Sequence, residues 1–204
     1  QLINSKLEHG WISSFDYYET LKDYTPETWF DDLSKTSYEG PFVVKGRTNS
    51  RKHEWNSKMF AKNRMDALLI ASELAKDSLI GTQGIIFRKY FPLKNLGTGM
   101  LYDLPYSDEW RFFCYKKHIL AYGPYWTQVL EDNLYGEMLS DMIEYANTLA
   151  NIISDYATFY VMDIARTETN NLILIELNDG QMSGLSGVDP DIMYSNLKKA
   201  INGQ

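Results

Sequence analysis

Two carboxylates and one amide in the last third of the chain have the residue types and the spacing expected of a divalent-cation site. Glu176 and Asn178 directly follow an apolar run, and on a strand two residues this far apart point to the same face. Antiparallel pairing with the preceding apolar segment would bring Asp163 onto the same patch. Oxygen ligands of this kind suit Mg²⁺. The alternative is an ordinary acidic strand end, because Asn-Asp-Gly by itself is a turn signal.

Two strands are needed to position these side chains. Residues 159–187 are predicted to contain a pair of strands joined by the polar turn at residues 167–171. The second strand opens with Leu-Ile-Leu-Ile at residues 172–175, which is apolar on both faces. This pattern predicts a strand buried in the middle of a sheet.

Basic residues that could bind phosphate follow a short apolar strand at residues 41–46. Lys45 lies at the end of this strand, and the polar segment after it contains Arg51 and Lys52 without any periodicity, which predicts a mobile loop. A lysine at a strand end beside a flexible basic loop can hold a polyphosphate. An exposed basic turn is the alternative.

A second basic pair lies in the strand predicted at residues 84–92. Arg88 and Lys89 are adjacent, so their side chains must point to opposite faces. Unless this strand is at the edge of a sheet, at least one of the two is expected to point away from solvent. A buried cation requires an anion.

A hairpin is predicted across Lys116 and Lys117, with strands at residues 108–115 and 118–123. Alternation places Glu109 and Arg111 on one face of the first strand. Such a couple is either a structural ion pair or an arginine that contacts phosphate and is held by its carboxylate partner.

The remaining elements are interpreted as structural. Helix start signals and apolar periodicity predict four helices, and two glycines with uncharged polar stretches predict a linker. The helices are expected at residues 25–35, 63–80, 133–155 and from 189 onward, and the linker at residues 93–105.

Composition excludes several classes of protein. The net charge of −7 argues against a nucleic-acid partner, and no apolar run is long enough to predict a membrane span. Cys114 is the only cysteine, which rules out an internal disulfide and a cysteine-based zinc site and favours a reducing, cytoplasmic location. The first residue is not Met, so further residues are expected to precede it.

In this order, the segments resemble the ATP-grasp fold. The likeness is closer to the divergent clade typified by cell-division-cycle protein 123, an assembly factor for a eukaryotic translation initiation factor. It covers roughly residues 41–201 and depends on the motifs PFVVKG with its basic loop, FRKYFPL, EWRFF, YVMDIA and IELND.

This resemblance implies an α+β fold. Two α+β subdomains with mainly antiparallel sheets would clamp ATP between them. Residues 1–40 would form an N-terminal arm, residues 41–92 the small subdomain and residues 93–204 the large one.

The resemblance also implies a role for each basic residue of the small subdomain. Lys45 would contact the α- and β-phosphates of ATP, and the loop with Arg51 and Lys52 would close over them. Arg88 and Lys89 would lead into the hinge on the adenine side. The backbone of this hinge, at Tyr90 and Phe91, would meet the base.

In the large subdomain, the resemblance implies that Arg111 approaches the terminal phosphate and acts with Lys45 in catalysis, and that Glu109 orients Arg111. The Mg²⁺ ligands it implies are Asp163, Glu176 and Asn178.

Two positions differ from the assembly-factor clade. Position 176 is Glu, as in most ATP-grasp enzymes, where that clade has Asp. A further arginine of the clade has no counterpart in residues 122–126, which leaves part of the terminal-phosphate contact unassigned.

The activity that the resemblance implies first is an ATP- and Mg²⁺-dependent carboxylate–amine ligase. The γ-phosphate passes to a carboxylate, and an amine then attacks the acyl phosphate, so no side-chain nucleophile is needed. The substrates are an unidentified carboxylate and amine, with a peptide or a protein among the candidates. An ATP-binding assembly factor with little turnover is the second hypothesis, and a small-molecule kinase is the third.

Overall fold

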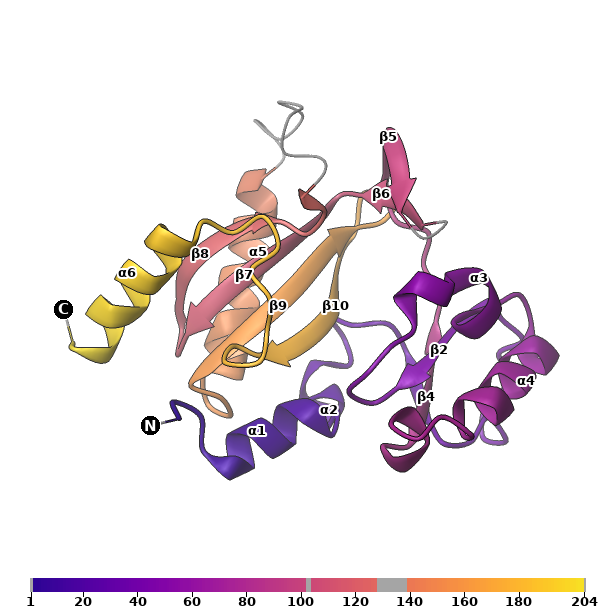
Figure 1. Cartoon of the computed structure of the whole chain (residues 1–204). Helices are drawn as coiled ribbons and strands as arrows, with labels where there is room; N and C mark the ends of the chain where they lie inside the picture. The colour runs from indigo at the N-terminus through magenta and orange to yellow at the C-terminus, as the bar shows by residue number, and fades with distance from the viewer. Residues whose placement is uncertain (1, 102–103, 128–138, 204) are drawn as a thin grey trace. The chain divides into compact units, whose positions relative to one another are not determined.

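The computed structural model describes residues 2–101, 104–127 and 139–203, and it is a mixed α+β protein (Figure 1). The chain divides into two compact units. The large unit comprises residues 1–12, 93–98 and 106–204, and the small unit comprises residues 13–92 and 99–105. No helix within the described ranges is both long and apolar enough to cross a membrane.

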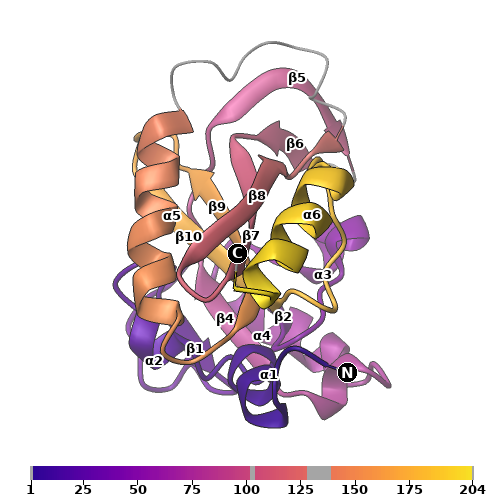
Figure 2. The ribbon, with the colours of Figure 1, turned by 90° about the vertical axis from the view of Figure 1, so that its left-hand side faces the viewer.

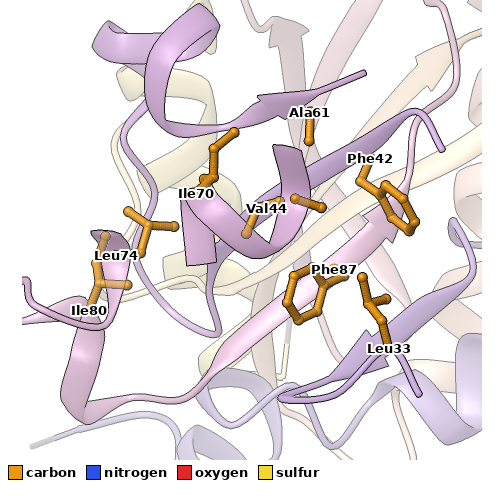
Figure 3. Packing of buried hydrophobic residues seen from close by; sticks show 9 residues of the cluster. Leu33, Phe42, Val44, Ala61, Ile70, Leu74, Ile80 and Phe87 are labelled. Carbon is orange, nitrogen blue, oxygen red and sulfur yellow. The ribbon is translucent and has the colours of Figure 1, made fainter. Parts of the chain in front are cut away.

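The small unit contains a four-stranded antiparallel sheet. Its order is β1 (Thr28–Phe30), β4 (Ile85–Lys89), β2 (Phe42–Gly46) and β3 (Phe60–Ala61). Helix α4 (Arg64–Leu74) contributes Ile70 and Leu74 to a core over one face of this sheet, as Figure 3 shows. The sheet side of this core includes Phe42, Val44 and Phe87.

Both boundaries of α4 have identifiable causes. Asn63 caps its N-terminus, because the side-chain Oδ1 accepts the Asp66 N–H at 2.9 Å. This cap confirms the predicted helix start. The helix ends at Leu74 and not near Ile80, because Asp77 Oδ1 accepts the N–H groups of Leu79 and Ile80 and turns the chain.

The large unit contains a second four-stranded antiparallel sheet. Its order is β10 (Leu172–Asp179), β9 (Phe159–Arg166), β7 (Glu109–Tyr115) and β8 (His118–Pro124). The two predicted hairpins, β7–β8 and β9–β10, are confirmed. Every residue of β9 is buried, so this strand forms the centre of the unit.

Two helices cover this sheet. The Tyr160 hydroxyl donates to the Ala150 carbonyl of α5 (Leu139–Ile153), so α5 lies on the face to which Tyr160 points. Helix α6 (Pro190–Ile201) packs on the opposite face, where Phe113 and Val161 meet Met193 and Leu197. Figure 2 shows the two helices on either side of the strands. The predicted start of α5 at residues 133–138 lies outside the described residues.

Short elements complete the described structure. Where a linker was predicted, two strands pair in a small sheet, β5 (Asn95–Leu101) and β6 (Leu104–Ser107). The N-terminal helix α1 (Lys6–Ser13) follows Asn4, whose side chain exchanges two hydrogen bonds with the backbone of Phe159. The others are α2 (Tyr18–Leu21), η1 (Lys52–Glu54), α3 (Trp55–Lys58) and η2 (Ile80–Thr82).

Three further predictions of secondary structure are wrong. The predicted helix at residues 25–35 is instead strand β1, because its backbone pairs with β4. The apolar strand β10 lies at the edge of its sheet and not in the middle. The segment predicted as a loop after Lys45 contains η1 and α3.

Candidate functional site

A row of three charged side chains crosses the sheet of the large unit. Arg111 of β7 pairs with Asp163 of β9, and Asp163 pairs with Glu176 of β10. Directly opposed residues of antiparallel strands point to the same face. The predicted meeting of Asp163 with Glu176 is therefore confirmed, and Arg111 joins them. We call these three residues the charged row.

Within the charged row, Arg111 and Asp163 form a two-point ion pair. The Nε and Nη2 atoms of Arg111 donate to Oδ1 and Oδ2 of Asp163, both at 2.8 Å. The two side chains are only 10% and 2% exposed. Two parallel charge-assisted hydrogen bonds in a buried setting fix the guanidinium in one plane.

Two further contacts hold Arg111. Its Nη1 donates to the Gly184 carbonyl at 2.6 Å, and its guanidinium carbon lies 5.0 Å from the centre of the Tyr125 ring. Burial disfavours the charged guanidinium, but the hydrogen bonds and the charge of Asp163 outweigh it, so the pKa of Arg111 is raised above its ordinary value. Arg111 therefore keeps its positive charge at this place in the sheet.

The loop that contributes Gly184 connects β10 to α6 and is fixed against β8. Gly187 N donates to the Pro124 carbonyl at 2.9 Å. A Cβ on Gly123 would overlap the Gly187 carbonyl, and a Cβ on Gly187 would overlap Pro124, so the loop and β8 approach this closely only with glycine at both positions. The loop is thereby positioned beside Arg111.

Glu176 and Asn178 lie side by side, as predicted from their spacing. Asn178 Nδ2 donates to Glu176 Oε2 at 3.4 Å. Both residues are partly exposed, whereas Asp163 is buried. Within the described ranges, no three His, Cys, Asp or Glu side chains are grouped as a metal site.

These oxygens nevertheless fit Mg²⁺. Mg²⁺ commonly binds through one or two carboxylates, and phosphate and water complete its shell. Glu176 and Asn178 provide a carboxylate and an amide oxygen, and Asp163 lies opposite Glu176. Both oxygens of Asp163 already accept from Arg111, so Asp163 is compensated before any cation binds.

A β-bulge determines the direction of Glu176. The register shifts between Leu174 and Glu176, so Leu174 pairs with Ile164 while Glu176 pairs with Asp163. The extra residue, Ile175, restarts the alternation of β10. Without the shift, Glu176 would oppose Met162 and point to the face of α5.

Glu109 is buried on β7, two residues before Arg111. Glu109 pairs in register with Ala165, and its Oε2 accepts a hydrogen bond from the Ser107 hydroxyl at 3.4 Å. Ser107 in turn accepts the Trp126 Nε1–H at 3.0 Å. Burial lowers the pKa of Arg111, whereas Asp163, Tyr125 and, least of these, the negative charge of Glu109 raise it. The two-point partner that sequence reasoning missed is Asp163, which was assigned only to the metal.

In the small unit, Lys45 and Arg88 lie on the same face of the sheet. Lys45 pairs with Ile86, and Arg88 pairs with Val43, so the two cations are close neighbours on adjacent strands. Both are buried, with 5% and 6% exposure. Arg88 Nη2 donates to Thr25 Oγ1 at 2.7 Å, and its Nε donates to Thr28 Oγ1 at 3.3 Å.

Lys89 lies on the opposite face. It pairs with Phe42, and its Nζ is 5.2 Å from the centre of the Tyr38 ring and 5.7 Å from that of Phe91. The next residue, Tyr90, packs edge-on against Phe60 with ring centres 5.0 Å apart. Of the predicted hinge residues, Tyr90 is therefore part of an aromatic cluster of the small unit.

Arg51 forms an ion pair with Asp77, and Lys52 begins η1. The hydrogen bond from Arg51, with those from the N–H groups of Ile80 and Leu79, lowers the pKa of Asp77 to about 2. Arg51 therefore joins the segment after Lys45 to the turn that ends α4. Nothing in the sequence spacing of these two residues indicated this pairing.

Comparison with known proteins identifies the class to which this chain belongs. The fold, with its two antiparallel sheets in separate units, is the ATP-grasp fold. A model of one family, an ATP-grasp domain that is the third family of its clade, matches residues 32–197. The chain belongs to this family. No curated protein matches the sequence.

Solved structures agree on the fold. Cdc123 from Schizosaccharomyces pombe matches with a TM-score of 0.58 and 15% identity, over 91% of this chain and 90% of that one. A D-alanine–D-alanine ligase from Bacillus anthracis, complexed with ATP, matches with a TM-score of 0.56 and 12% identity, over 97% and 64%.

The ATP-grasp ligase PsnB, complexed with a minimal precursor, matches with a TM-score of 0.55 and 14% identity, over 97% and 62%. The chain thus spans less than two thirds of either ligase, and at these identities the likeness is one of fold.

Proposed function

We propose that this chain binds ATP with Mg²⁺ and joins a carboxylate to an amine through an acyl phosphate, with a peptide or a protein supplying one of the two. The observation that supports this most is the charged row. Together with Asn178, the charged row places a fixed arginine beside two carboxylates and an amide on one face of a sheet in an ATP-grasp protein.

In the large unit, we assign Glu176, Asn178 and Asp163 to Mg²⁺ and Arg111 to the terminal phosphate. Mg²⁺ would neutralise charge on the β- and γ-phosphates. Asp163 would act mainly by holding Arg111, since both its oxygens accept from the guanidinium. Glu109 would add negative charge behind Arg111.

In the small unit, we assign Lys45 to the α- and β-phosphates. Its buried position on the same face as Arg88 supports a pair of cations for one polyanion. The remaining residues assigned to ATP are Arg51, Lys52, Tyr90 and Phe91, and Lys89 is assigned to the adenine-side hinge and not to a phosphate. In this proposal residues 41–92 form the small ATP-grasp subdomain, residues 93–204 form the large one, and residues 1–40 form an arm.

The proposed reaction has two steps. A substrate carboxylate oxygen attacks the γ-phosphorus, and the bond to the bridging oxygen breaks so that ADP leaves. The amine then attacks the acyl carbon, phosphate leaves, and the nitrogen loses a proton. Neither step needs a protein nucleophile. The lone cysteine, Cys114, is fully buried with a pKa raised by burial, so it is unsuited to that role.

Binding tests the proposal before any substrate is known. Titration calorimetry with ATP and Mg²⁺ should show saturable binding that is weakened by Asp163→Asn, Glu176→Gln and Lys45→Ala. Glu168→Gln, in the exposed turn of the same hairpin, is the matched control and should bind as the wild type does. Unchanged binding in all three variants would contradict the assignment.

Turnover tests the ligase itself. Release of ADP and phosphate should depend on a second substrate, which can be sought by offering pools of amino acids and peptides. The same three variants should lose this release. An enzyme that consumes ATP without forming a C–N bond would instead be a kinase or an ATPase.

A second candidate, an ATP-binding assembly factor with little turnover, is favoured by one observation. The chain and Cdc123 cover each other over about nine tenths of their lengths, whereas about a third of each ligase lies outside the match. This candidate predicts a stable protein partner. A pull-down in which Arg111→Ala loses the partner, while no acceptor stimulates ADP release, would favour it over the ligase.

A further inference from the structure

Phe15 lies in a part of the small unit for which no chemistry was predicted. It precedes residues 32–197, the range matched by the family model, and follows α1 in a turn. Its ring is nevertheless close to two cations. Arg88 places its guanidinium carbon 5.3 Å from the ring centre, and Lys45 places its Nζ 6.0 Å from it.

The sheet explains why one ring meets both cations. Lys45 of β2 and Arg88 of β4 point to the same face, two residue positions apart along the paired strands. Phe15 covers this face, while α4 and its core cover the other. Both buried cations therefore pack against the Phe15 ring.

The backbone of Phe15 is in a conformation that bulky residues avoid. Its φ is +66°, in the left-handed region, and its side chain is 2% exposed. Such a conformation persists where the surrounding structure fixes it, and it is concentrated at functional sites. Here the ring is fixed by Tyr17, with centres 4.4 Å apart, and by the edge of Phe30, at 6.1 Å.

An aromatic face stabilises a nearby cation without neutralising it. The ring quadrupole attracts an ammonium or guanidinium group within about 6 Å. It also restricts the position of a long, flexible side chain such as lysine.

We propose that Phe15 is a positioning residue for ATP: its ring holds the Lys45 ammonium and the Arg88 guanidinium in place for the phosphates through cation–π contacts. This inference depends on the proposed function, because it takes Lys45 and Arg88 as phosphate-binding groups. It extends that function to a residue of the N-terminal segment, outside the matched family region.

The test replaces Phe15 with mono-, di- and trifluorinated phenylalanine, which weaken the ring quadrupole stepwise while keeping its shape. The Kd for ATP with Mg²⁺ should rise with each fluorine and reach about threefold to tenfold at three fluorines. The melting temperature should stay close to that of the wild type. Phe15→Leu, which removes the ring, should weaken ATP binding at least as much as trifluorination.

Phe42 provides the matched control, because it is buried on β2 but points to the opposite face, into the core. Trifluorination at Phe42 should leave the Kd unchanged. An equal rise in Kd at both positions, or no trend along the Phe15 series, would overturn the inference.

A measurement without nucleotide separates this inference from the proposed function. Heteronuclear NMR of the Arg88 Nε–H should show faster hydrogen exchange along the Phe15 series and no change with Phe42. If the wild type does not bind ATP, the proposed function fails, and the Arg88 measurement alone decides whether Phe15 positions the cations. Unchanged exchange throughout the series would contradict the inference even if ATP binds.

Discussion

Asp163 and Arg111 hold each other through two hydrogen bonds of 2.8 Å across strands β9 and β7. The sequence analysis predicted a different role for each residue, with Asp163 binding the metal and Arg111 contacting a phosphate. Their pairing changes the electrostatics of the site, because together they contribute no net charge. A cation at the charged row therefore meets the negative charge of Glu176 and the dipole of Asn178.

The first prediction concerns Mg²⁺. With the charge of Asp163 compensated, the protein alone should bind Mg²⁺ weakly, and ATP should strengthen binding by adding phosphate oxygens. Glu176→Gln should weaken the binding of ATP with Mg²⁺ by at least about 10-fold, since losing outer partners of a metal alone costs about 10- to 100-fold.

Calorimetry with Mg²⁺ alone, ATP alone and both together measures whether ATP strengthens the binding of Mg²⁺. Glu168→Gln is the control, because it removes one carboxylate from the turn of the same hairpin. Tight binding of Mg²⁺ without nucleotide would show that Arg111 does not compensate Asp163 as the pairing indicates.

The second prediction concerns stability. Arg111→Met leaves Asp163 buried without its two-point partner and should destabilise the protein by about 3–5 kcal/mol, as seen when one member of a buried ion pair is removed. Adding Asp163→Leu should recover much of this loss, because an apolar pair of similar size needs no counter-charge.

Urea unfolding of the two variants measures these free energies. The double variant should fold and still fail to bind ATP with Mg²⁺, which separates the structural role of the pair from its role in binding. If the double variant were as unstable as the single one, the ion pair would not be the source of the loss.

Local patterns in the sequence predicted a large part of the fold. The alternation in β7, the polar turn between β9 and β10, and the Asn63 cap of α4 are each visible in a few neighbouring residues. These signals involve neighbouring residues, so they can be recognised without knowing which distant residues pack against them. The order of the short motifs along the chain also predicted the ATP-grasp fold.

The remaining features depend on residues far apart in the chain. The start signal at Thr25 is typical of a helix, but pairing of Thr28 with Arg88 makes this segment a strand. The apolar run of β10 resembles a central strand, but the bulge at Ile175 resets its alternation at an edge. The partners of Arg51 and Arg111 lie 26 and 52 residues away.

The third prediction compares two lysines on opposite faces of the small sheet. Lys45→Met should weaken ATP binding by about 10- to 100-fold, because a hydrogen bond to a charged group is worth about 1.5–3 kcal/mol. Lys89→Met should weaken it by no more than about threefold, because the Lys89 Nζ lies over the Tyr38 and Phe91 rings on the other face.

Calorimetry with ATP and Mg²⁺ gives both values, and melting temperatures check that each variant is folded. The two substitutions are chemically identical, so each serves as the control for the other. Equal losses would mean that the face on which a lysine lies does not decide its role.

The last prediction is a pH dependence at Asp77. Hydrogen bonds from Arg51, Ile80 and Leu79 lower the pKa of Asp77 from 3.8 to about 2 in the folded protein. A carboxyl group whose pKa is lower in the folded state binds fewer protons there, so it stabilises the fold above the unfolded pKa. This stabilisation should be fully present above about pH 4 and should be lost as the pH falls from there to about 2.

Asp77→Asn removes the titrating group. The variant should be less stable than the wild type at pH 7, and the difference should shrink as the pH approaches 2. Thermal unfolding between these limits measures it, with Asp66 as the control position, because Asp66→Asn leaves the Arg51 ion pair intact. A difference between wild type and Asp77→Asn that stayed constant with pH would show that Arg51 and the two backbone N–H groups do not favour the ionised carboxylate.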